Sequence, residues 1–142
     1  MTNVSLAQSY LVKATKRMKT LEILMREEAY SDVIRESQEI VELALKGMLR
    51  HVGIEPPKWH DVGSLIVDHK DRFPKRVAEN AEELAEISKW LRKEREFSFY
   101  GDIDFIPTEE YTVEDAQKAV QGAQLAVVHA ELVITRPTTS TT

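Results

Sequence analysis

A long helical pattern between residues 30 and 52 constrains the fold of this chain more than any other feature of its sequence. Apolar side chains recur there at intervals of three and four residues, the period of an α-helix that buries one face. Gly53 suits the position just past the helix end, and the prolines at 56 and 57 forbid continuation of the helix. At about 1.5 Å per residue, this helix is about 35 Å long. Only a bundle of comparable helices covers a stripe of that length.

Three further segments show the same period and supply those partners. They run from about residue 5 to 28, from 74 to 97 and from 113 to 134. Ser5 is a suitable N-cap for the first, and Thr112 followed by acidic residues is typical of the start of the last. In the second, one face is apolar, whereas a neighbouring face is small at first and cationic at its end.

A short helix after Pro57 completes the predicted fold. His60 or Asp61 is placed to cap it, and Gly63 lowers its helix propensity. Strand signals are scarce throughout. We therefore predict an all-α fold, an up-and-down antiparallel bundle of four long helices and one short helix, without a β-sheet.

Composition indicates one domain over residues 1–135, followed by a Pro/Thr/Ser tail at 136–142 that we expect to be disordered. Cysteine is absent, which excludes disulfides and thiol nucleophiles. The net charge of −5 argues against non-specific binding of a polyanion, although it allows a local basic cleft. No apolar run reaches the roughly 18 residues that span a bilayer. Because the N-terminus is also polar, we expect a cytoplasmic protein with no membrane association.

The candidate binding residues are Arg92, Arg95 and Tyr100. The two arginines are three residues apart, so they share one helix face near its C-terminal end, and the tyrosine follows where that helix ends. Two guanidinium groups are able to hold a phosphate, and a phenol ring is able to stack on a base. The alternative is that cations simply favour a helix C-terminus and that neighbouring acids neutralise them. We expect a nucleotide or phosphate site here, and no catalytic residue, metal site or cofactor.

The last helix predicts self-association. Its apolar residues cover more of the circumference than one core contact needs. The additional ones are Ala119, Leu125, Ala126, Val128 and Leu132. Because broad exposed apolar surfaces mark interfaces, we expect a homodimer.

Three sequence blocks, in order, resemble the HEPN family, a helical domain named for higher eukaryotes, prokaryotes and nucleotide binding. The first is 42–49 followed by Gly53, similar to the family's AELALKALL…G stretch. The second, 60–66, resembles its HDLxxLL stretch. The third, 91–102 followed by 111–116, resembles the R…YGD…Y[TS]xEDA passage before its last helix. The similarity spans about residues 6 to 134.

The resemblance implies a helical bundle, frequent homodimers and two alternative roles. Many prokaryotic members resemble the partner of a small nucleotidyltransferase in two-gene toxin–antitoxin pairs, whereas others are metal-independent ribonucleases with an Arg-x4–6-His motif. In this chain, Arg95 and four further residues are followed by Tyr100 instead of His. A phenol, with a pKa of about 10, is a poor general base beside imidazole at about 6.5.

We therefore predict a non-catalytic domain that binds a nucleotide, a nucleotidyltransferase partner, or both. One alternative is a ribonuclease toxin that uses the degenerate motif Arg95-x4-Tyr100. The other is a structural interaction module whose arginines are merely solvated.

Overall fold

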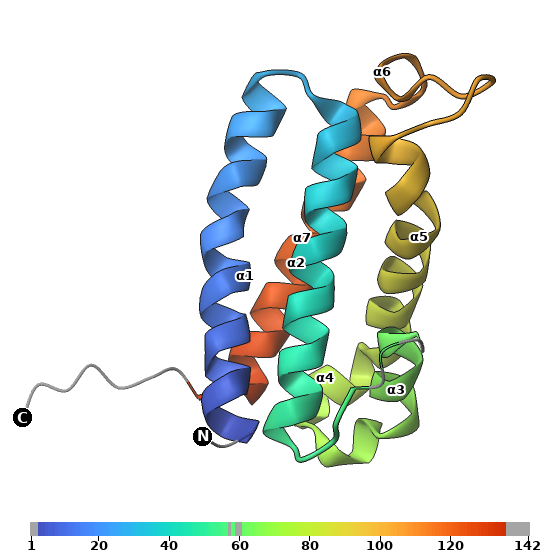
Figure 1. The fold of residues 1–142 in the computed structure, drawn as a ribbon. Helices are drawn as coiled ribbons and strands as arrows, with labels where there is room; N and C mark the ends of the chain where they lie inside the picture. Colours follow the sequence, from blue (N-terminus) through green and yellow to red (C-terminus); the bar gives the residue numbers. More distant parts are fainter. Residues whose placement is uncertain (1–2, 57, 59–60, 136–142) are drawn as a thin grey trace, which may run out of the picture.

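Four long helices form an antiparallel bundle in the computed structural model, which describes residues 3–56, 58 and 61–135 (Figure 1). They are α1 (Asn3–Arg26), α2 (Tyr30–His51), α5 (Ala81–Phe99) and α7 (Val113–Val133). No β-strand occurs within the described ranges; their only bridge joins Asp102 and Phe105. The prediction of an all-helical bundle is confirmed. None of the helices in the described part of the chain is long and apolar enough to cross a membrane.

Helix α2 is the centre of the bundle. It contacts α1, α5 and α7, and it lies between α1 and α5 in Figure 1 with α7 behind. Its predicted stripe is buried, including Ile34, Leu45 and Met48 at 0% exposure. Burying each such side chain contributes about 1.5–3 kcal/mol. On α1, the buried positions near the start are Ala7 and Leu11, four residues apart.

The C-terminal end of α2 forms the predicted glycine stop. Gly53 has a φ of +84°, a conformation that favours glycine. Its N–H donates to the carbonyl of Arg50 at 3.0 Å, and the N–H of Ile54 donates to Leu49 at 2.9 Å. This pair of bonds is a Schellman motif, which satisfies carbonyls that the helix leaves without partners. The guanidinium of Arg72 also donates to the carbonyl of Val52.

The helix predicted to run from Pro74 to Phe97 is divided in two, so the predicted number of helices is wrong. A separate helix, α4 (Lys75–Glu79), ends at Asn80, whose side-chain amide donates to the carbonyl of Arg76 at 2.7 Å. That bond provides the end of α4 with a local partner, and α5 begins at Ala81. A second additional helix, α6 (Pro107–Glu110), begins at a proline in the loop before α7, and a 3₁₀ turn spans Lys70–Arg72.

The predicted short helix is α3 (Val62–Asp68), and it packs closely on α5. Asp61 caps it by accepting a hydrogen bond from the N–H of Gly63 at 3.0 Å. The alternative cap, His60, lies outside the described residues. A side chain at Gly63 would place its Cβ 2.7 Å from the Cα of Ala85, so glycine permits this contact. The small half of the second face of α5 therefore serves to seat α3.

Helix α7 begins with the predicted cap and uses most of its apolar surface within the chain. Thr112 and Asp115 form a capping box, with hydrogen bonds of 3.2 and 3.0 Å. The helix contacts α1, α2, α4 and α5, which buries Ala119 and Ala126 completely. The exposed apolar residues that remain on it are Val128 and Leu132, at 41% and 43% exposure. Self-association through α7 stays a prediction.

Candidate functional site

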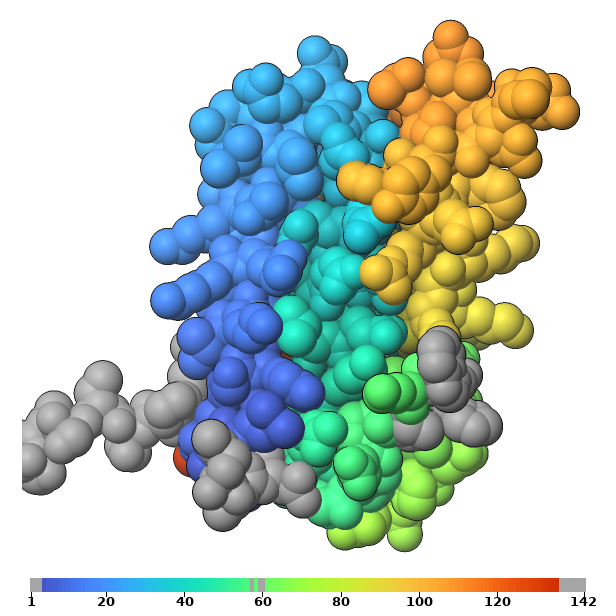
Figure 2. Space-filling view, viewed as in Figure 1, coloured from blue at the N-terminus to red at the C-terminus, as the bar shows by residue number. Residues whose placement is uncertain are grey.

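The structure brings two of the three predicted binding residues together. Arg95 and Tyr100, at the C-terminal end of α5, line a surface depression of about 260 Å³ with Arg35 of α2 and Glu96. In the space-filling view of Figure 2, the yellow-to-gold end of α5 borders the cyan first half of α2. Tyr100 is 73% exposed, so its ring is accessible to a ligand. The depression thus combines two guanidinium groups, a phenol and one carboxylate.

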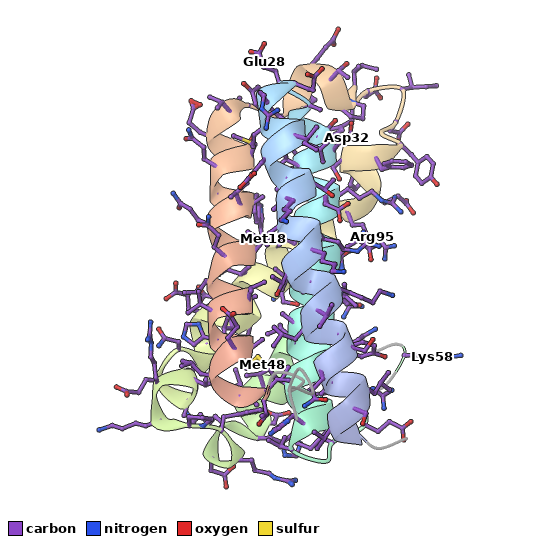
Figure 3. The ribbon with its side chains drawn as sticks, turned by 90° about the vertical axis from the view of Figure 1, so that its left-hand side faces the viewer. Met18, Glu28, Asp32, Met48, Lys58 and Arg95 are labelled. Carbon is purple, nitrogen blue, oxygen red and sulfur yellow. The ribbon has the colours of Figure 1, made fainter. Side chains whose placement is uncertain are left out.

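Arg95 is held by a carboxylate of the neighbouring helix. Its Nη2 lies 2.9 Å from Oε1 of Glu39 on α2, and the two side chains are 46% and 33% exposed. Figure 3 shows Arg95 on the side of the bundle away from α7, extending outward. An ion pair this exposed contributes only about 0.2–1 kcal/mol. It positions the guanidinium at the depression without burying its charge.

Arg35 is a binding candidate that the sequence did not identify. Its guanidinium carbon lies 4.0 Å from the centre of the Phe99 ring, a cation–π contact between α2 and α5. Phe99 in turn meets Tyr100 edge-on, with ring centres 4.8 Å apart. Arg35 sits in the strong amphipathic pattern of α2, where a surface arginine carries no distinguishing local signal. Only the packing of α5 on α2 shows that it borders the same depression.

Arg92 takes a different place from the other predicted residues. It lies three residues before Arg95 on α5 and is half-buried, and it is not among the described residues that line the depression. The second face of α5, which was predicted to carry both arginines to one site, therefore has two uses. Its first half packs against α3, and Arg95 near its end lines the depression, with Arg92 between these two parts.

An exposed apolar surface continues from the depression over the end of α5 and the loop that follows. We call it the α5-end patch. Its large side chains are between 42% and 90% exposed. They are Phe97, Phe99, Tyr100, Ile103 and Ile106. Such a concentration of exposed large apolar side chains within ten residues is typical of interaction surfaces.

The loop that carries Ile103 is held by local contacts. The backbone groups of Asp102 and Phe105 exchange two hydrogen bonds, of 2.9 and 3.0 Å, and the ring of Phe105 packs between Phe97 and Tyr111. The Tyr111 hydroxyl donates to Oε1 of Glu94 at 2.9 Å. Burial, followed by this hydrogen bond to a carboxylate, raises the pKa of Tyr111 well above its ordinary value. Ile103 is therefore presented to solvent on an anchored turn.

Larger hollows lie elsewhere, and two of them lack paired cations. One, of about 580 Å³, lies between α1 and α7, and Figure 3 shows Met18, one of its lining residues, between these helices. The other, of about 410 Å³, lies between α5 and α7, where Lys118 sits 4.1 Å from the centre of the Trp90 ring. Each is lined by one basic residue, Arg26 and Lys118 respectively. A third hollow, of about 360 Å³, lies on α1 and is lined by Lys13, Lys16, Arg17 and Thr20, so it offers cations but no aromatic ring. The depression at the end of α5 combines two guanidinium groups with the phenol ring of Tyr100.

Comparison with known proteins gives one match. The family model described as the HEPN domain matches residues 7–129, which is most of the chain. No curated protein matches, and no solved structure matches. The helical bundle and the extent of the match agree with the resemblance seen in the three sequence blocks. The chain belongs to the HEPN domain family.

Proposed function

We propose that this protein is a non-catalytic HEPN domain that binds a nucleotide at the depression between α2 and α5. The observation that carries the proposal is the convergence of Arg35, Arg95 and Tyr100, from two helices, on one depression of about 260 Å³. Guanidinium groups stay charged at any physiological pH and bind phosphate oxygens through paired N–H donors. An exposed phenol ring next to them offers a base a surface on which to stack.

The positions of the histidines support a non-catalytic role. Among the described residues, histidine occurs at His51, His69 and His129. These residues lie near the C-terminal ends of α2, α3 and α7, whereas the depression lies near the other end of the bundle (Figure 1). None of these imidazoles lines the depression. The imidazole of the family's Arg-x4–6-His motif, a general acid–base group that contributes about 10²–10⁴ in rate, therefore has no counterpart among the described residues that line this depression.

The α5-end patch supports a protein partner beside the nucleotide site. We assign to it the class of partner implied by the family resemblance, a small nucleotidyltransferase in a toxin–antitoxin pair. Such an enzyme holds a nucleotide, and the patch lies next to the proposed anion site. The test is to purify this chain together with the product of an adjacent nucleotidyltransferase gene. We expect the two proteins to co-purify, and we expect Ile103→Asp to abolish the co-purification.

Titration of nucleotide into wild type and Arg95→Ala tests the binding site. We expect weak binding of AMP and of a short RNA by wild type, and about a five-fold or greater loss of affinity in the variant, since a charge-assisted hydrogen bond is removed. Arg76→Ala is the matched control, because it removes one exposed arginine from α4, away from the depression. Unchanged binding in Arg95→Ala would remove the site and favour a structural module.

RNA cleavage, followed in the same samples without added metal, tests the alternative function. Arg95 and Tyr100 do line one depression, which is the observation in favour of a ribonuclease with a degenerate motif. We expect no cleavage above a buffer control. Robust cleavage that Tyr100→Phe abolishes would replace the non-catalytic function with the ribonuclease.

A further inference from the structure

The anion site contains its own competing anions. Glu39 lies on α2 one turn after Arg35, and its carboxylate contacts the Arg95 guanidinium at 2.9 Å. A second carboxylate, Glu96, lines the depression itself. The charges of Arg35 and Arg95 are thus formally balanced by two acids before any ligand arrives. A ligand phosphate must either replace Glu39 at Arg95 or bind beside its negative charge.

We infer that Glu39 is a specificity-determining residue, an internal competitor that limits the proposed nucleotide site to ligands of low charge. This inference rests on the proposed function. A monophosphate is able to contact both guanidinium groups, and only one phosphate group is then repelled by the two carboxylates. A triphosphate brings further negative charges into a small depression whose acids already balance its arginines, so repulsion offsets the added contacts. The site therefore prefers AMP to ATP.

The geometry allows the exchange. The Arg95–Glu39 pair is exposed by a third or more on each side, so water and ligand reach both groups. Because an ion pair of this kind is weak, its replacement by a dianionic phosphate costs little free energy. Arg35 is held separately by its contact with Phe99, and it remains in place while Arg95 changes partner.

The test is titration with AMP and with ATP of wild type, Glu39→Gln and a control, Glu36→Gln, at constant ionic strength. Glu36 is a suitable control because it also pairs with an arginine, at 2.7 Å, but that arginine is Arg17 of α1. Both variants remove one negative charge from the same stretch of α2. We expect Glu39→Gln to tighten AMP binding about two- to five-fold and to reduce the preference for AMP over ATP. Glu36→Gln should change both affinities less.

A double variant shows whether Glu39 acts through Arg95. In an Arg95→Ala background, Glu39→Gln should no longer tighten AMP binding, because the competition has been removed. Weaker or unchanged AMP binding in Glu39→Gln would overturn the inference and make Glu39 a residue that merely orients Arg95. Equal gains in the two single variants would also overturn it. If wild type and Glu39→Gln both fail to bind AMP, the proposed nucleotide site itself fails.

Discussion

Replacing Gly63 by Ala tests the contact that seats α3 on α5. A Cβ at this position would lie 2.7 Å from the Cα of Ala85 and 3.2 Å from both the Ala85 carbonyl oxygen and the Ser88 Cβ. The nearest atom belongs to the main chain of a long helix, so it cannot rotate away. Overpacking of this kind costs about 1–3 kcal/mol. The gain in helix propensity on replacing glycine, at most about 1 kcal/mol, offsets only part of that cost.

We therefore expect Gly63→Ala to lower the free energy of unfolding by about 1–2 kcal/mol. At about 3–4 °C per kcal/mol for a chain of this size, the Tm should fall by about 3–8 °C. Urea unfolding followed by far-ultraviolet circular dichroism measures the free energy. If the slope of the unfolding free energy against urea concentration is unchanged, the loss of stability arises in the folded state.

Gly122→Ala is the matched control within the same chain. Its Cβ would lie 2.8 Å from Cγ2 of Ile87, the branch methyl of a half-buried side chain beside the hollow between α5 and α7. Because χ1 of a β-branched residue in a helix is restricted, that methyl group yields by a small displacement toward the hollow and not by a new rotamer. Position 122 also lies inside α7, where alanine gains its full helix propensity. We expect stability within about 1 kcal/mol of wild type. A Gly63→Ala protein as stable as wild type, or less affected than Gly122→Ala, would refute the close-contact argument.

Two further predictions concern pH and assembly. Because the folded-state pKa of Tyr111 is raised, its stabilising contribution is complete below the unfolded value of about 10 and is lost as the pH rises above it. The difference in unfolding free energy between wild type and Tyr111→Phe should therefore shrink above about pH 10 in paired urea titrations, and a difference constant with pH would contradict this. For assembly, sedimentation at micromolar concentration should show a dimer of the 16.3 kDa chain that Leu132→Asp dissociates and Ile103→Asp does not. A monomeric wild type would contradict the prediction drawn from α7.

The sequence by itself determined the features that depend on neighbours within a few residues. The period of α2 predicted its buried face, and Gly53 and Thr112 marked a helix end and a helix start that the structure confirms. Such signals are readable because helical faces and caps involve residues three or four positions apart. The same kind of pattern, extended over residues 74–97, predicted one helix where the structure has two, separated at Asn80. The sequence alone does not distinguish an asparagine whose side chain ends a helix from an asparagine on the exposed face of a continuous helix.

The tertiary structure decided which side chains make up the candidate site. Arg95 was visible in the sequence, but its partner Glu39 and its neighbour Arg35 are about 60 residues earlier in the chain. Their approach depends on how far α5 lies along α2, and the contacts that join these two helices there are Arg35 on Phe99 and Glu39 on Arg95. Helical periodicity places a residue on a face, but it contains no information about which face of another helix lies opposite, because that is settled only when all the apolar stripes are packed together.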